Sequence, residues 1–271
     1  TDLHLPLALD IEAAQVGRLQ VDSAPPLFDI QTKLALGDAN GARHTLHTLR
    51  FRTERLQAEA QGELAATSPL ALQLKASARS LDGAATPWQA TLQLSGPLAK
   101  LQAQAHLAGA DAKGPALDAD ATLTPFAAWP LASLNLRTQA LDLAALQADA
   151  PHTQLRGEAH VKSSGMAAPA DVDATLVNED PGRWDENKLP LRRLHLAAQG
   201  QPQALGDLKL QTLELDLGGA TPGGQLRGSG ALQPVAGAER LQLKLLLDGL
   251  RPATLDQRLP AMTLAGPLTL E

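Results

Sequence analysis

Leucine alternates with polar residues along most of this chain, and the alternation recurs in segment after segment. Examples are Leu72-Gln73-Leu74, Leu92-Gln93-Leu94 and Leu213-Glu214-Leu215. A period of two places successive side chains on opposite faces of a pleated strand, whereas a helix needs apolar spacings of three and four. The pattern therefore predicts many β-strands, each with one apolar and one polar face. It leaves open what the apolar face contacts.

Turn residues separate the alternating segments at short intervals. Gly37–Gly41, Ser95–Pro97, Gly109–Pro115 and Gly218–Gly224 are rich in the glycine, proline, asparagine and aspartate that turns require. Roughly 15 to 18 strands of ordinary length fit between such breaks, which is too many for one compact sandwich. We therefore predict an all-β fold in which an elongated β-sheet curls, so that the leucine faces line one apolar groove.

Two segments, residues 140–151 and 249–260, interrupt the alternation in the same way. Each has leucines at helix-like spacings, ends at a proline and continues as Leu-x-Gly. Pro260 follows Pro151 at the same offset at which Gly266 follows Gly157, and three pairs of leucines share this offset. We interpret this as an internal repeat with short crossing helical segments. The expected organisation is a first β-groove region at 1–151 with a crossing at 140–151, a second at 152–260 with a crossing at 249–260, and the start of a further unit at 261–271.

Composition bears on what the apolar face contacts. Hydrophobic residues make up 44% of the 271 residues, but aromatic residues only 2%. A lining of leucine and alanine is smooth and chemically inert, which suits acyl chains, although a leucine-rich sandwich core would have the same composition. The expected groove-lining residues are Phe28, Ile30, Leu34, Leu72, Leu74, Leu92, Leu94, Leu134, Leu136, Leu194, Leu196, Leu213, Leu215, Leu243 and Leu245.

Other chemistry is weakly represented. The net charge is −6 without a basic stripe, which argues against a nucleic-acid surface, and cysteine is absent. His44 and His47 would point to opposite faces of a strand, so they do not form a metal pair. No catalytic constellation is recognisable, and we expect neither an enzyme nor a cofactor. A lipid, detergent or fatty acid in the groove is the ligand that we expect.

Two stretches resemble a known family. Asn178–Leu191, which contains a Pro-Gly turn and Trp184, and Thr124–Leu131, followed by Leu141–Leu143 and Leu155–Gly157, look like the TamB family. This family is the translocation and assembly module subunit of Gram-negative bacteria. Most of the chain resembles this family in its general sequence character, whereas the motifs themselves lie in these short stretches. From the segment's place between two strands we also expect Trp184 to cover an open end of the apolar face.

The resemblance implies an AsmA-like bridge-like lipid transfer protein, whose sheet is often called a β-taco of repeating β-grooves. It implies a fragment of the periplasmic β region of a longer protein that is anchored in the inner membrane. The function then expected is a periplasmic bridge that conducts phospholipids between the membranes and supports outer-membrane biogenesis. The alternative is an assembly factor for outer-membrane β-barrel proteins and autotransporters, acting by β-augmentation.

The partners expected from these two functions are phospholipid acyl chains in the groove and an outer-membrane barrel partner, similar to TamA, that is bound through regions outside this fragment. Nucleic acid is not expected as a partner. Exposed sheet edges are expected to allow self-association. A third possibility, from the residues alone, is a structural β spacer with a dry core. A continuous apolar cavity would favour lipid transport, whereas an exposed edge without a groove would favour assembly.

Overall fold

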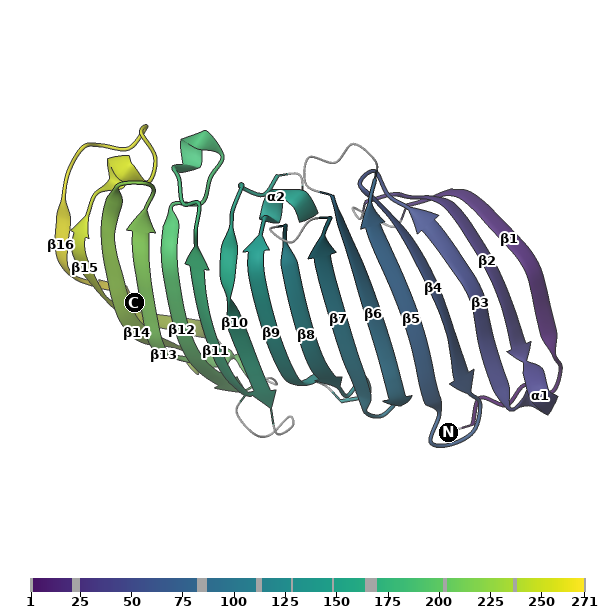
Figure 1. Cartoon of the computed structure of the whole chain (residues 1–271). Coiled ribbons are helices and arrows are strands. Elements are labelled where there is room, and N and C mark those ends of the chain that lie inside the picture. The colour runs from purple at the N-terminus through teal and green to yellow at the C-terminus, as the bar shows by residue number, and fades with distance from the viewer. Residues whose placement is uncertain are drawn as a thin grey trace. The chain divides into compact units, whose positions relative to one another are not determined.

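In a computed structural model the chain is almost entirely β-strand, as the alternation predicts (Figure 1). The structure describes residues 2–20, 25–81, 87–110, 114–127, 129–147, 149–163, 170–201, 204–235 and 238–270. The strands follow one another in a single sheet in the order of the sequence, from β1 to β16. The prediction of an all-β fold built on one sheet is therefore confirmed. The period of the pattern outweighs the helix propensity of leucine and alanine.

The chain divides into two compact units, of which unit 1 comprises Thr1–Gly114 and Asp118–Phe126, and unit 2 comprises Pro115–Leu117 and Ala127–Glu271. Strand β8 (Ala116–Leu123) contributes residues to both units. Unit 1 contains β1 (Leu9–Leu19), β2 (Leu27–Gly37), α1 (Asp38–Gly41), β3 (Arg43–Arg52), β4 (Leu56–Ala65), β5 (Ala71–Ser80), β6 (Trp88–Pro97) and β7 (Leu101–Gly109). Unit 2 contains β9 (Leu131–Leu141), α2 (Leu143–Leu146), β10 (Leu155–Ser163), β11 (Ala170–Asn178), η1 (Trp184–Glu186), β12 (Leu191–Gln201), β13 (Ala204–Gly218), β14 (Pro222–Val235), β15 (Ala238–Leu250), η2 (Pro252–Thr254) and β16 (Leu264–Leu270).

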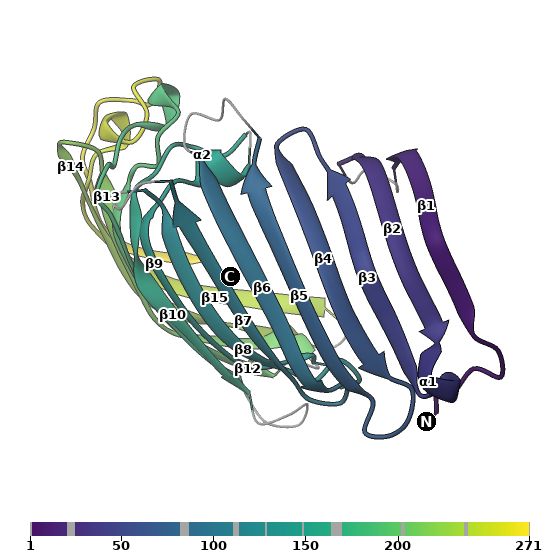
Figure 2. The same ribbon diagram turned by 45° about the vertical axis from the view of Figure 1, so that its right-hand side comes forward.

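Each unit is an antiparallel meander, because each strand pairs antiparallel with the next strand in the sequence. The pairing is interrupted by bulges, for example between Leu46 and Leu49 in unit 1 and between Leu210 and Leu213 in unit 2. A bulge adds twist and bends a strand locally. The long strands β13 to β15 of unit 2 bend strongly along their length in Figures 1 and 2.

Three long connections of unit 2 lie at the same end of its strands, because each follows an odd-numbered strand of the antiparallel sheet. They are residues 142–154 with α2, residues 179–190 with η1, and residues 251–263 with η2. Figure 1 shows these helical turns at the upper strand ends of the unit. We name these three segments the loop rim. Each joins neighbouring antiparallel strands, so the two predicted crossing segments, residues 140–151 and 249–260, run along the rim formed by the strand ends.

The two segments of the predicted repeat have matching surroundings. Leu141 pairs with Leu155 at the first and Leu250 with Leu264 at the second, which is the same pair moved by the offset of the repeat (250 − 141 and 264 − 155). Both pairs border a bulge in the ladder. Ala140 and Gly249, which are related by the same offset, both have positive φ, 50° and 60°. The lead-in strands and the turns therefore agree, while the predicted boundaries of the repeating regions stay predictions.

Candidate functional site

The apolar face of unit 2 is built by cross-strand pairing. Residues directly opposite each other in an antiparallel sheet point to the same face, so pairs can be followed from strand to strand as rows. One row from β9 to β16 is Leu136, Ala159, Ala174, Leu196, Leu213, Gly228, Leu245 and Leu268. A second is Leu134, Val161, Val172, Ala198, Leu210, Gly230, Leu243 and Leu270. A third from β10 to β16 is Gly157, Leu176, Leu194, Leu215, Leu226, Leu247 and Gly266. These rows contain no charged side chain.

Unit 1 has an apolar face of the same construction but with smaller residues. One row from β1 to β7 is Ile11, Leu34, Leu46, Gly62, Leu74, Leu94 and Ala103. The next is Ala14, Thr32, Leu49, Ala60, Ala76, Leu92 and Ala105. A shorter row is Phe51, Ala58, Ala78, Ala90 and Leu107. Thr32 is the one polar member of these three rows.

All fifteen residues that the sequence predicts to line a groove are half-buried in the structure. None is buried as in a dry core, and none is as exposed as a surface side chain. No large side chain among the described residues is completely buried. Neighbouring apolar side chains of the same sheet thus shield these residues partly, and a tightly packed second layer is not what covers them. Fourteen of the fifteen lie among other apolar side chains, and Phe28 differs.

Phe28 lies between two arginines. The guanidinium carbons of Arg18 and Arg52 are 5.8 Å and 5.1 Å from the centre of its ring. Arg52 is also paired with Asp29, whose backbone has a positive φ of 51°. Cations at this distance are attracted to the face of the ring. The structure therefore gives Phe28 a cation–π role, and its predicted contact with a ligand is not tested.

The opposite face of each unit is polar. In unit 2 a row of this face is Arg137, Glu158, Thr175, His195, Glu214 and Arg227. In unit 1, Arg50 and Glu59 form an ion pair of 3.1 Å, and a hydrogen bond from Lys33 lowers the pKa of Glu12. Such exposed pairs contribute little stability and serve mainly to keep this face in water. Leu246, which is 52% exposed, and Val177, which pairs with Arg156 and Arg193, are apolar residues on this face of unit 2.

Two glycines in β14, Gly228 and Gly230, leave the apolar face of unit 2 without side chains at two positions of this strand. A Cβ on Gly228 would lie 2.6 Å from the Cδ2 atom of Leu245, and a Cβ on Gly230 would lie 2.5 Å from the Cδ2 atom of Leu243. The leucines of β15 therefore lean over the backbone of β14. The alternation alone does not single out these glycines, although both occupy apolar positions of their strand.

Side chains at the loop rim hold neighbouring connections together. The Oδ1 atom of Asn178, a buried residue on the apolar side of β11, accepts a hydrogen bond from the N–H of Gln154 at 3.0 Å, and its Nδ2 donates to the carbonyl of Leu189 at 3.3 Å. The N–H of Trp184 donates to the carbonyl of Leu255 at 2.8 Å. The three connections are thus bonded in series along the edge. Leu141 and Leu155, at the rim end of the apolar face, are buried.

One ion pair at the loop rim, Asp256–Arg258, strongly lowers the pKa of its carboxyl group. Asp256 accepts side-chain and backbone hydrogen bonds from Arg258, and these lower the pKa of Asp256 to about 2. Asp185, on the neighbouring connection, accepts a hydrogen bond from the N–H of Gln257 at 3.0 Å. Arg183 lies 3.3 Å from Asp185 and 2.7 Å from Glu186. Asp185 therefore links the second connection to the third, while the other two ion pairs each lie within one connection.

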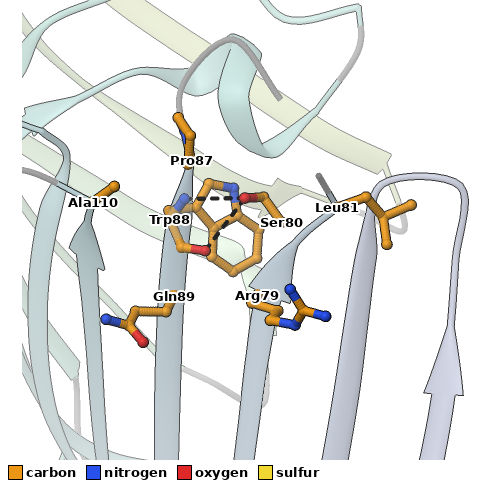
Figure 3. A pocket seen from close by; sticks show the side chains of 7 residues that line it. All are labelled: Arg79, Ser80, Leu81, Pro87, Trp88, Gln89 and Ala110. Carbon is orange, nitrogen blue, oxygen red and sulfur yellow. Dashed lines mark hydrogen bonds between the residues drawn. The ribbon is translucent and has the colours of Figure 1, made fainter. Parts of the chain in front are cut away.

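Trp88, and not Trp184, is the buried aromatic residue at a strand end. Trp184 is 54% exposed, so the expectation that it covers the apolar face is wrong. Trp88 begins β6 and is only 9% exposed. The backbone N–H of Trp88 donates to the hydroxyl oxygen of Ser80 at 3.1 Å, and the Ser80 hydroxyl donates to the backbone carbonyl of Trp88 (Figure 3). A pocket of about 330 Å³ surrounds this contact, lined by Arg79, Ser80, Leu81, Pro87, Trp88, Gln89 and Ala110.

Further chemical features of the described residues are few. His44 and His47 have different surroundings: Leu36 and Leu64 flank His44 in the sheet, whereas His47 is exposed. Within the described ranges, no group of three or more His, Asp or Glu side chains is placed to hold a metal ion. No helix in the described part of the chain is long and apolar enough to cross a membrane.

No protein-family model, curated protein or solved structure matches the chain.

Proposed function

We propose that the apolar face binds phospholipid acyl chains and lets them move from strand to strand. The observation that supports this most directly is the set of continuous rows of leucine, alanine and glycine. Their side chains are half-buried rather than packed into a core. Burial of a methylene group contributes about 0.8 kcal/mol, so a two-tailed lipid gains many kcal/mol on such a surface. Because successive positions are chemically alike, little free energy is lost when a chain moves to the next one.

In the wider proposal the chain belongs to a periplasmic bridge of the TamB type. The bridge would connect the inner and outer membranes of a Gram-negative bacterium and supply phospholipid for outer-membrane biogenesis. The support is the resemblance of the segments around Trp129 and Trp184, together with the sequential antiparallel sheet. The activity would be binding and conduction without a chemical step.

An assembly factor for outer-membrane β-barrel proteins is the second candidate. Its support is the same resemblance of the segments around Trp129 and Trp184, because the family is named for translocation and assembly. An unpaired strand edge can accept an incoming strand through main-chain hydrogen bonds.

Arginine substitutions in the apolar face test the lipid proposal. Leu74→Arg and Leu215→Arg should leave the protein folded, because a half-buried arginine can extend its charged head into water. Binding of a fluorescent phospholipid should fall about tenfold or more, since a charge then interrupts the apolar rows. Gln73→Arg and Gln242→Arg, at exposed positions on the polar face, are the matched controls and should bind lipid normally. Circular dichroism melts accompany each binding assay.

Two results would count against the proposal. If Leu74→Arg and Leu215→Arg unfold the protein, the apolar face is a dry core, and the spacer interpretation is correct. If the variants stay folded and bind lipid as well as the wild type, the apolar face does not carry lipid and the assembly function is favoured. Mass spectrometry of lipids that copurify with the wild-type protein identifies the head groups.

A further inference from the structure

The carboxylates in the second and third connections of the loop rim, residues 179–190 and 251–263, all have a cationic partner. The ion pairs join Glu179 to Arg156, Asp180 to Lys188, Asp185 and Glu186 to Arg183, and Asp256 to Arg258. A cation at this end of the strands that takes no part in these pairs keeps its charge for another ligand.

Two arginines beside the turn from β13 to β14 are such cations. Arg192, near the start of β12, donates from its Nη1 atom to the carbonyl of Gly219 at 3.4 Å, and Arg251, which follows β15, donates to the carbonyl of Pro222. Among the described residues, no carboxylate forms an ion pair with either guanidinium group. A guanidinium group has five N–H donors, so each arginine keeps most of its donors for a further acceptor.

Arg192 belongs to the apolar side of β12. The next residue, Arg193, is exposed on the polar face opposite Asp216, whereas Arg192 is half-buried and lies two positions before Leu194 of the apolar rows. The pairing of β12 with β13 has a bulge between Leu191 and Arg193, which leaves Arg192 without a partner on β13. Bulges redirect side chains and are frequent beside functional sites. A cation therefore stands at the rim end of the apolar face.

We infer that Arg192 binds the phosphate group of a phospholipid whose acyl chains lie on the apolar face of unit 2, and that Arg251 adds positive charge at the same turn. Guanidinium groups bind phosphate through two parallel hydrogen bonds, and a phosphate has oxygen atoms for more than one such group. Leu194 is about 7 Å from Arg192 along the strand, at about 3.3 Å per residue. A phosphate held by Arg192 therefore places the first part of the acyl chains at the leucine row of Leu194.

The phosphate contact gives a lipid a preferred place and orientation on a face that is otherwise uniform. The apolar rows of β12 to β15 offer chemically similar positions, so they alone do not favour one of them. With Arg192 as the contact, the head group lies at the loop rim and the acyl chains extend away from it along the strands. The inference rests on the proposed function for the acyl chains, whereas the phosphate contact alone would also suit free phosphate.

Two fluorescent lipids with the same acyl chains test the contact: a phosphatidylglycerol, and a diacylglycerol that lacks the phosphate. The wild type should bind the phosphatidylglycerol about tenfold more tightly, because charge-assisted hydrogen bonds then add to the apolar contacts. Arg192→Gln should remove this preference and leave diacylglycerol binding unchanged. Arg193→Gln, at the next residue but on the polar face, is the matched control and should keep the preference. Arg251→Gln should reduce the preference and gives a second test if Arg192→Gln fails to fold in circular dichroism melts.

The two lipids also separate failure of this inference from failure of the proposed function. If the wild type binds both lipids equally, or if Arg192→Gln keeps the preference, the phosphate contact is overturned while acyl-chain binding stands. If the wild type binds neither lipid, the proposed function fails, and titration with inorganic phosphate followed by phosphorus NMR decides about the arginines. Phosphate binding that is lost in Arg192→Gln would support the site as one for free phosphate, and no binding would overturn it.

Discussion

The apolar faces of units 1 and 2 follow the same alternation but differ in the size of their side chains. In unit 1, Ala58, Ala78 and Ala90 stand side by side on β4, β5 and β6. In unit 2 the corresponding kind of row contains Leu194, Leu215, Leu226 and Leu247 on β12 to β15. The period of two decides which face a residue joins. Residue size then decides how far the side chains shield one another and the backbone.

The contrast also involves glycine. In unit 2, two positions of β14 on the apolar face are glycines, Gly228 and Gly230. The side chains of Leu245 and Leu243 of β15 extend over them. Unit 1 has one such glycine, Gly62, and elsewhere it has alanines such as Ala58, Ala78 and Ala90 at the apolar positions. The same substitution therefore has different consequences in the two units. The predictions below use this difference, starting with the largest expected effect.

A leucine should be tolerated at Ala78 but not at Gly228. Gly228→Leu places a side chain where a Cβ alone would lie 2.5 Å from the carbonyl oxygen of Lys244, so the strands must separate. We expect a loss of about 1–3 kcal/mol or more of unfolding free energy. Ala78→Leu faces Ala58 and Ala90 and should change stability by less than about 0.5 kcal/mol.

Urea denaturation followed by circular dichroism measures both variants. Gly17→Ala is the control for introducing a Cβ on a glycine in a strand, because no atom lies within 4 Å of a Cβ built there. Equal losses for Gly228→Leu and Ala78→Leu would mean that the difference in residue size between the units has no effect on packing.

Truncation of a leucine should cost more in unit 2. Leu215 pairs with Leu194 and Leu226, whereas Leu74 pairs with Gly62 and Leu94. Both residues are half-buried, so Leu215→Ala should cost about 1–2 kcal/mol, below the range of fully buried leucines, and Leu74→Ala about 1 kcal/mol or less. The measurement is the shift of the urea midpoint at constant slope. A larger loss for Leu74→Ala would contradict the comparison.

Much of the fold follows from the sequence, because alternation of this length leaves few choices. The rows through Leu74, Leu94, Leu196 and Leu213 are predictable, since a strand fixes the face of every second residue. The cross-strand partners are not, because bulges such as the one between Ile11 and Ala14 shift the register without a clear sequence signal.

The exposure of Trp184 shows why the sequence does not predict which tryptophan is buried at a strand end. Its Pro-Gly turn and its position between two strands suggested that it covers the sheet. In the structure, backbone bonds and the ion pairs of Asp185 and Glu186 hold the connection at the edge, where the ring stays exposed. Trp88 is buried, and its backbone N–H and carbonyl are bonded to the hydroxyl of Ser80. Contacts of this kind depend on which strands become neighbours, and a single sequence does not specify them.

The loop rim belongs to unit 2, and its ion pair should give this unit an acid sensitivity of its own. The pKa of Asp256 is lowered to about 2 in the folded protein by Arg258, from an ordinary value of about 3.9. Its contribution to stability is therefore complete above about pH 4 and is lost as the pH falls from 4 towards 2. Asp256→Asn should remove this part of the pH dependence.

Thermal melts of the wild type and Asp256→Asn between pH 2 and 7 are the measurement. The melting temperatures should differ near neutral pH and converge at the acid end. Glu12→Gln in unit 1 is the control with an exposed pair, and it should lower the melting temperature less than Asp256→Asn does near neutral pH. Parallel curves at all pH values would show that the pair does not stabilise the folded state through its charge.

The smallest expected effect concerns an exposed leucine on the polar face of unit 2, Leu246. Leu246 pairs with Arg227 and Pro267 and is on the opposite side of the sheet from Leu245 and Leu247. Leu246→Gln should therefore leave unfolding free energy within about 0.5 kcal/mol of the wild type and leave lipid binding unchanged, since it removes little apolar contact. Leu245→Gln, at the preceding residue but on the apolar face, should lower both the unfolding free energy and the binding of lipid. If the two variants behave alike, the assignment of the two faces in this part of unit 2 is wrong.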